Sequence, residues 1–155
     1  MLSPETSSSH DISVLNSLIE TTLDSVDGYR RSAEEATNSR FSEDFRRHAT
    51  ERQQIVTTLQ AEVRRLGGTP EDDGSVLAAA HRTFLTLRDK VTGGDDKSVL
   101  AEVDRGETYL KGKWEAALQD DKLSAATRST ITQCYDSVRS GHDQWAAMNR
   151  TMATS

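Results

Sequence analysis

The sequence has little of the chemistry that many folds and functions require. It contains one cysteine, two prolines and 5% aromatic residues among 155 residues. Because Cys134 is alone, it can form neither an internal disulfide nor a cysteine-rich zinc site, and it fits a reducing compartment. No apolar run is long enough to span a membrane, and the opening MLSPETSSSH has no apolar signal segment. We therefore expect a cytoplasmic protein that is not inserted in a membrane.

No stretch of the sequence carries mostly acidic or mostly basic residues. The net charge is −6, with acidic and basic residues interspersed, and no basic face carries interleaved aromatic residues. The sequence has no glycine-rich phosphate loop, no nucleophile elbow and no Cys-x-x-Cys motif. Nucleic-acid binding is therefore not expected, no catalytic or cofactor-binding residue stands out, and a non-enzymatic protein is favoured.

What the sequence does contain is helix-forming residues. Alanine, glutamate, arginine, leucine and glutamine are abundant, and no window alternates with the period of two that is typical of strands. The class is therefore all-α, and the length fits one domain. We expect residues 1–10 to be a disordered lead, 11–150 to form a helical bundle and 151–155 to be a frayed tail.

Apolar residues at three- and four-residue steps predict four long helices, over about 11–36, 39–66, 96–119 and 125–150. Asn38, Asp95 or Asp96, and Ser124 are the expected N-caps. Gly67 and Gly68, followed by Pro70, are expected to end the second helix through the left-handed geometry that glycine adopts readily. The buried faces are expected to include the following residues: Leu15, Leu18, Ile19, Thr22, Val26, Tyr29, Ala33, Phe41, Phe45, His48, Ile55, Leu59, Val63, Leu66, Val99, Val103, Leu110, Trp114, Ala117, Thr127, Ile131, Tyr135, Val138, His142, Trp145 and Met148.

A shorter amphipathic helix is predicted over residues 75–92, between the Gly67-Gly68 and Gly93-Gly94 pairs. Such a long link lets the second and third long helices run in the same direction, which is the ferritin-like form of the four-helix bundle. The competing arrangement is a simple up-down-up-down bundle, in which this shorter helix would become a fifth member.

Carboxylates and histidines within the apolar faces are the candidate metal ligands. Di-iron and di-manganese bundles use one Glu from each of two helices and a Glu-x-x-His pair from each of the other two. Glu107 and His142 lie on their faces by spacing, and Glu51 lies at the inner edge of the second helix. The remaining ligand positions hold Val26, Gln54 and Arg139, so half of the ligand set is missing.

Three interpretations of these residues remain open. Arg139 could supply the missing positive charge by pairing with Glu107 or Glu51, because a buried carboxylate without a partner is costly. Alternatively, the side chains reach solvent. In the third, Glu51, Glu107 and His142 bind a single metal ion. A dinuclear cluster is disfavoured, because Val26 removes a carboxylate and Arg139 adds a cation, and no metal or other cofactor is expected.

Several segments resemble a known family. They are LNSLIETTLDSVDGYRRSAEEA, LQAEVRRLGGTPEDDGSVLAAAHR, TGGDDKSVLAEVDRGETYL and QCYDSVRSGHD, with GGTPEDDGS and TGGDD the most specific parts. They resemble the bacterial ferritin-like family of unknown function numbered 2383, from about Val14 to Met148. The resemblance implies a ferritin-like fold, a bacterial source and no established reaction.

The wider relatives of that family, the rubrerythrins and ferritins, carry Gly-Glu on helices one and three and Glu-x-x-His on helices two and four. Here Gly106-Glu107 keeps the first motif, whereas Ser25-Val26 does not. Glu51 is kept with Gln54 in place of His, and His142 is kept with Arg139 in place of Glu. These departures argue against oxidase, peroxidase or iron-storage activity.

The sequence therefore favours a non-catalytic ferritin-like bundle with a degenerate di-metal site that acts by association. Family analogy places it in a bacterial stress response, with a protein partner that is unknown. A homodimer is expected, because the 75–92 helix and the Trp145 end of the last helix offer more apolar surface than one core can cover. Two alternatives are the single-ion metalloprotein and a histidine phosphotransfer bundle, which would use an exposed His48 beside Arg46 and Arg47.

Overall fold

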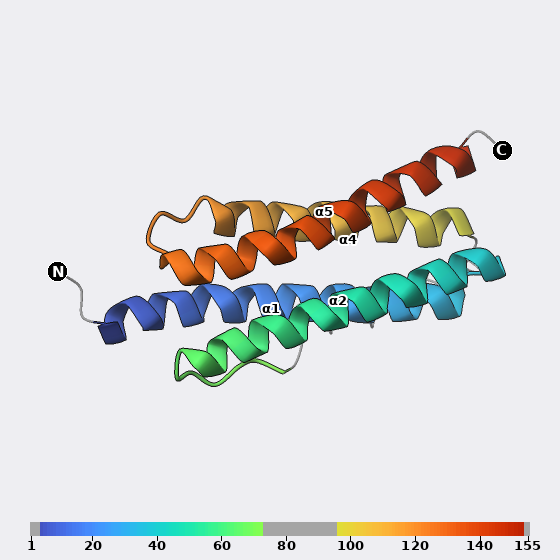
Figure 1. Ribbon diagram of the computed structural model, residues 1–155. Helices are drawn as coiled ribbons and strands as arrows, with labels where there is room; N and C mark the ends of the chain where they lie inside the picture. Colours follow the sequence, from blue (N-terminus) through green and yellow to red (C-terminus); the bar gives the residue numbers. More distant parts are fainter. Residues whose placement is uncertain (1–3, 73–95, 154–155) are drawn as a thin grey trace.

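Four helices make up the part of the chain that the structure, a computed structural model, describes: residues 4–72 and 96–153, with side chains at 8–72 and 96–147. The helices are α1 Pro4–Glu35, α2 Ser39–Arg65, α4 Asp96–Leu118 and α5 Ala125–Ala153 (Figure 1). The all-α class is confirmed. The helix that the sequence predicts over 75–92 lies outside the described residues.

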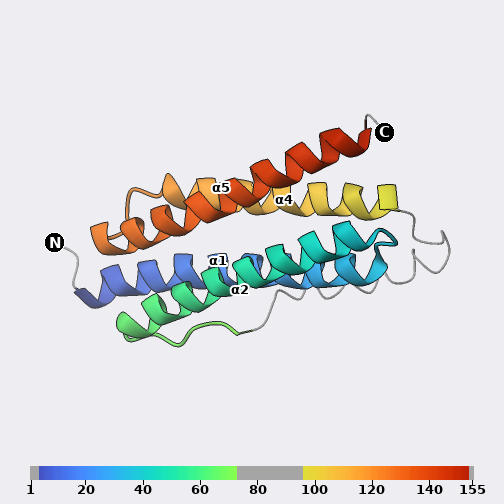
Figure 2. The same ribbon diagram turned by 45° about the vertical axis from the view of Figure 1, so that its right-hand side comes forward.

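The helices form a bundle in which every neighbouring pair is antiparallel. α1 packs against α2 and α4, and α5 packs against the same two helices from the other side. Figures 1 and 2 show that α2 and α4 run in the same direction, with the start of α4 at the same end of the bundle as the start of α2. The prediction of parallel second and third helices is therefore confirmed, and the up-down-up-down alternative is excluded.

Local capping chemistry sets three of the helix ends, as predicted. The Asn38 side chain accepts a hydrogen bond from the backbone N–H of Arg40 (2.9 Å), and Ser124 Oγ accepts one from the N–H of Thr127 (3.3 Å). At the end of α2, Gly67 has a φ of 85°, the left-handed region. The N–H groups of Gly67 and Gly68 bond the carbonyls of Arg64 and Val63, a Schellman motif.

The first helix begins earlier than expected. The predicted start was about residue 11, with a disordered lead before it, but α1 begins at Pro4. Contacts with the α4–α5 turn account for the order near residue 10: His10 Nε2 lies 2.8 Å from Asp120 Oδ2. The buried Asp11 carboxylate accepts hydrogen bonds from the Ser124 N–H (3.1 Å) and the Thr127 hydroxyl (3.0 Å), so it joins α1 to the start of α5. At the other end of the chain, α5 reaches Ala153, inside the predicted frayed tail.

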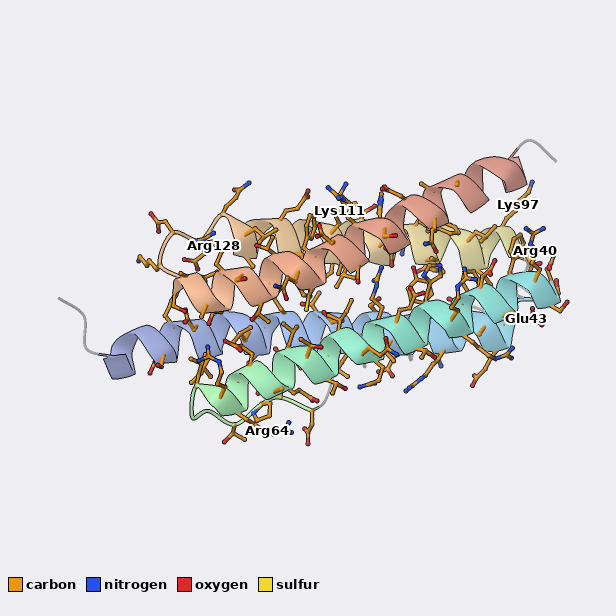
Figure 3. All side chains as sticks on the ribbon, in the orientation of Figure 1. Arg40, Glu43, Arg64, Lys97, Lys111 and Arg128 are labelled. Carbon is orange, nitrogen blue, oxygen red and sulfur yellow. The ribbon has the colours of Figure 1, made fainter. Side chains whose placement is uncertain are left out.

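Side chains of two apolar clusters fill the two halves of the bundle (Figure 3 draws the described side chains on the ribbon). The cluster nearer the α4–α5 turn contains Leu15, Leu18, Ile19, Ile55, Val56, Leu59, Val63, Leu110, Trp114, Leu123, Ile131, Cys134 and Val138. The other contains Val26, Tyr29, Ala33, Phe41, Phe45, Ala49, Val99, Leu100, Val103 and Trp145. Most residues predicted to be buried lie in one of these clusters; Leu66, Ala117, Tyr135 and His142 are only partly buried, and the Met148 side chain is outside the described residues.

Two glycines allow a test of the helix-end analysis. We expect Gly67→Ala to lower the free energy of unfolding by roughly 1–2 kcal/mol, because its φ of 85° strains a residue that has a Cβ. Gly28→Ala is the matched control, since Gly28 lies exposed within α1 with nothing within 4 Å of an added Cβ. It should raise stability by up to about 1 kcal/mol. Urea unfolding measures both, and equal effects would contradict the assignment of Gly67 as the cap.

Candidate functional site

A buried ion pair joins α2 to α4 at the junction of the two apolar clusters. Arg52 Nη1 lies 2.9 Å from Glu107 Oε1, and Arg52 Nη2 donates to Glu107 Oε2 at 3.1 Å. The side chains are 1% and 2% exposed. Two parallel N–H···O contacts form the bidentate geometry in which a guanidinium binds a carboxylate most strongly. The interaction therefore fixes the separation and the register of α2 against α4.

Residues of α1 complete the hydrogen bonding of this pair. The Tyr29 hydroxyl donates to Glu107 Oε1 at 2.5 Å, and Ser25 Oγ accepts from Arg52 Nη1 at 2.9 Å. The Arg52 guanidinium also lies 5.6 Å from the centre of the Tyr29 ring. Burial, reinforced by the Glu107 charge, raises the pKa of Tyr29 well above its ordinary value, so the phenol stays a neutral donor. Three helices thus supply one connected polar layer.

His48 forms the edge of the layer one turn before Arg52 on α2. Its ring stacks on Tyr29 with centroids 5.1 Å apart and an interplanar angle of 23°. Burial lowers the pKa of His48, although the neighbouring Glu51 carboxylate opposes this effect. Among the described residues, His48 Nδ1 has no hydrogen-bond partner, and Glu51 Oε2 lies 3.7 Å away. His48 is therefore a neutral, packed imidazole.

A glycine of α5 makes room for the guanidinium. A Cβ added at Gly141 would lie 2.9 Å from Arg52 Nη2 and 3.6 Å from His48 Nδ1. The first distance is shorter than Cβ contacts in real proteins, and the guanidinium cannot move aside without breaking its bonds to Glu107 and Ser25. Gly141 is therefore the α5 residue that admits Arg52 to the bundle centre.

The six positions predicted from the ferritin-like ligand pattern fall in different places. Val26 and Glu107 are buried, and His142 is partly buried with Nδ1 lacking a hydrogen-bond partner among the described residues. The other three lie at the surface: Glu51, with a side chain 44% exposed, and the exposed Gln54 and Arg139. On α2, Arg52 faces the bundle centre instead of Glu51 or Gln54. On α5, Gly141 does so instead of Arg139.

The hypothesis that Arg139 pairs with Glu107 or Glu51 is wrong. The Arg139 side chain is 58% exposed, and its contact is Asp136 on its own helix, at 3.7 Å. Arg52 supplies the internal cation instead. A sequence signal existed, because Arg52 follows His48 by four residues and precedes Val56 by four, which places it on the buried face of α2.

The histidine phosphotransfer alternative is also wrong, because it requires an exposed histidine. His48 is 1% exposed and stacked on Tyr29, so no phosphodonor can reach its ring. Cys134 is a buried free cysteine, and burial raises the pKa of its thiol, so the reactive thiolate is disfavoured. His81 lies outside the described residues.

The residues of the layer do not fit a dinuclear metal site. Two divalent ions need several carboxylates around them. The layer offers one carboxylate, Glu107, and both of its oxygens are bonded to Arg52, with Tyr29 on Oε1. Within residues 4–72 and 96–153, no three His, Cys, Asp or Glu side chains gather in a metal-binding arrangement. In the same part of the chain, no helix has the length and apolar character needed to cross a membrane.

Comparisons with known proteins agree with the fold. The profile of a family described as Domain of unknown function (DUF2383) matches residues 10–120. Curated proteins give no significant match. Among solved structures, the fold is similar to that of the bacterioferritin-related protein from Bacteroides fragilis, described as a dodecameric thioferritin, with a TM-score of 0.72 and 12% identity over 95% of this chain and 88% of that one. At such low identity the similarity shows the fold, which is ferritin-like.

The ion pair predicts a large effect of removing its cation. We expect Arg52→Met to lower the free energy of unfolding by about 3–5 kcal/mol, because it leaves Glu107 buried without a counter-charge. Arg139→Ala, which removes an exposed arginine, should cost less than about 1 kcal/mol. The double variant Arg52→Met/Glu107→Leu should recover most of the loss. Chemical denaturation of the three variants measures this, and equal losses for Arg52→Met and Arg139→Ala would contradict the assignment.

The neutral state of His48 predicts a pH dependence. Its pKa is lowered on folding, so the unfolded chain takes up this proton at a higher pH than the folded protein does. The neutral His48 ring therefore makes its full contribution to the free energy of unfolding above about pH 6.5. This contribution is lost as the pH falls toward the lowered pKa of His48. His48→Phe keeps a stacked ring without the titration and should flatten the profile below about pH 6.5. Unfolding curves between neutral and acidic pH test this; identical profiles for the two proteins would refute it.

Proposed function

The chain belongs to the DUF2383 family, and on this premise we propose that it is a non-catalytic ferritin-like bundle protein that acts by association. In this proposal, the di-metal site of the wider fold is degenerate, and the Arg52 guanidinium supplies the positive charge at the bundle centre. The observation that supports it most is the bidentate contact of Arg52 with Glu107, buried between α2 and α4.

Charge balance favours this proposal over a metal-dependent activity. The guanidinium and the single carboxylate neutralise each other, and the Tyr29 phenol is neutral. A guanidinium stays charged at every physiological pH and offers only N–H donors. It therefore stabilises the carboxylate as a metal ion would, but it has no coordination position to which a substrate oxygen could bind.

Association is proposed from the fold neighbour and from one surface residue. The similar bacterioferritin-related protein is described as dodecameric. Tyr109, on the outside of α4, is the large apolar side chain that stands exposed (54%) among the described residues, and Lys113 lies 5.4 Å from its ring centre. Trp145 does not contribute as the sequence suggested, because it is 1% exposed and its indole N–H donates to Asp104 at 3.2 Å. We propose a homodimer in the bacterial cytoplasm, with a stress-related role by family analogy.

A single-ion metalloprotein is the second candidate, and unpartnered imidazole nitrogens favour it. Nδ1 of His48 and Nδ1 of His142 are buried and lack hydrogen-bond partners among the described residues. Each lies near a carboxylate, 3.7 Å from Glu51 and 3.8 Å from Asp143 respectively. Imidazole and carboxylate together suit several divalent transition metals. In this alternative Glu107 remains bonded to Arg52, so the ligand set would differ from the predicted Glu51, Glu107 and His142.

Metal content separates the two candidates. We expect the purified protein to carry less than about one tenth of an equivalent of iron, manganese or zinc, because the bundle centre already contains its own cation. Elemental analysis after dialysis against a mild chelator measures this. Metal retained at close to one equivalent, and lost in the variant His48→Phe, would replace the proposal with the single-ion alternative.

Association predicts a mass above that of one chain. Light scattering at micromolar concentration should return at least twice the 17.1 kDa of the monomer, because specific interfaces normally persist at that concentration. Tyr109→Ser should lower the measured mass if the exposed ring lies in the interface, whereas Thr132→Ser, on the exposed face of α5, should not. A monomer mass at every concentration would contradict the homodimer.

A further inference from the structure

The outer face of α4 carries an exposed aromatic ring. Tyr109 is 54% exposed, whereas the other large apolar side chains that the structure describes are covered by their neighbours to a greater extent. A tyrosine ring offers a large apolar area with a polar tip, which is why tyrosine is enriched where proteins meet. The side chains that surround it on this exposed face are small: Ala101, Gly106, Thr108, Gly112 and Ala116. A second helix can therefore approach α4 closely on either side of the ring.

Gly106 leaves an open position beside Tyr109. The two residues are three apart in the sequence, so they are neighbours on the surface of the helix. A Cβ added at Gly106 would have no described atom of another segment within 4 Å, so the space above its backbone is open. The ring of a second molecule can pack directly on the backbone there. One helix thus provides both halves of a self-complementary contact, an exposed ring and an open position that can receive it.

Charges of both signs follow the edge of this face that borders α5. Asp104 accepts a hydrogen bond from the Trp145 indole of α5 at 3.2 Å, and Glu115 accepts one from the Tyr135 hydroxyl of α5 at 2.9 Å, which places both carboxylates at this edge. Lys111 follows Asp104 by seven residues, or about two turns, so it lies at the same edge. The edge therefore presents an acid, a base and an acid along the helix.

A second copy of α4 in the antiparallel orientation matches both features at once. A two-fold axis between residues 107 and 108 brings Tyr109 level with the partner's Gly106, and Gly106 level with the partner's Tyr109. The same axis brings Asp104 level with the partner's Lys111, so opposite charges meet twice. A parallel copy would instead bring each residue level with its own counterpart, so that the ring would miss the glycine. Charge and shape therefore favour the same antiparallel arrangement.

We propose that a second copy of this chain docks on the outer face of α4, with the two α4 helices antiparallel and each Tyr109 ring over the partner's Gly106. The reciprocal contacts of Asp104 with the partner's Lys111 set the orientation. Arg105, whose side chain is 62% exposed, comes beside the partner's Tyr109 ring, where a guanidinium adds cation–π attraction. The inference rests on the association proposed above and names the surface through which it occurs.

Disulfide formation at the two-fold axis tests this surface in the full chain. In a Cys134→Ala background, Thr108→Cys places a thiol next to the axis, and Thr132→Cys on the exposed face of α5 is the matched control. Thr108→Cys should form the cross-linked dimer at least about ten-fold faster, because the interface holds its two thiols at a high effective concentration. Equal rates in a protein with the mass of a dimer would overturn this interface but not the association. A monomer mass would overturn both.

Filling the open position at Gly106 tests the contact with the ring. Gly106→Leu has room in the single chain but occupies the space that the partner's Tyr109 needs, so the dissociation constant of the dimer should rise at least about ten-fold. Gly28→Leu, at an exposed glycine of α1 with the same open surroundings, is the control and should leave the dissociation constant unchanged. Urea unfolding confirms that both variants fold. An unchanged dissociation constant in folded Gly106→Leu would overturn the proposal.

Discussion

The rest of the bundle centre depends on one electrostatic constraint, the need to neutralise Glu107. An unpaired carboxylate that is 2% exposed would cost several kcal/mol, a large part of the stability of a small domain. Arg52 removes that cost, and its neighbours hold it in place: Ser25 accepts from its guanidinium, Tyr29 donates to the carboxylate, and Gly141 leaves space on α5. In the proposed function, this guanidinium takes the place of the metal ions that other four-helix bundles hold in their cores.

The sequence predicts the structure correctly where the interactions that determine it join residues close in the chain. Apolar spacing predicted the four helices, and the caps at Asn38, Gly67 and Ser124 lie where expected, because each cap bonds groups within a few residues of itself. The parallel course of α2 and α4 also followed from the length of the link between them. The start of α1 was missed, because Asp11 and His10 bond residues more than a hundred positions away.

In one interpretation, the sequence predicts a buried arginine that pairs with Glu107 or Glu51, but it points to Arg139 instead of Arg52. The ligand pattern of ferritin-like bundles contains carboxylates and histidines and therefore does not point to Arg52, although the spacing of Arg52 from His48 and Val56 places it on the same face. The pattern points instead to Arg139, which occupies one of its ligand positions, but that position is exposed here. No local signal could identify the Tyr29 hydrogen bond to Glu107, since the residues are 78 positions apart.

The central claim is that Arg52 takes the place of a metal ion, and metal-dependent stability tests it most directly. Chemical denaturation would compare the natural protein, Arg52→Glu and Arg52→Gln with and without Mn²⁺. We expect no effect of Mn²⁺ on the natural protein or on Arg52→Gln. Arg52→Glu places a second carboxylate opposite Glu107 and should gain about 2.7 kcal/mol when Mn²⁺ is at 100 times its dissociation constant. Stabilisation of the natural protein by Mn²⁺ to the same extent would contradict the account.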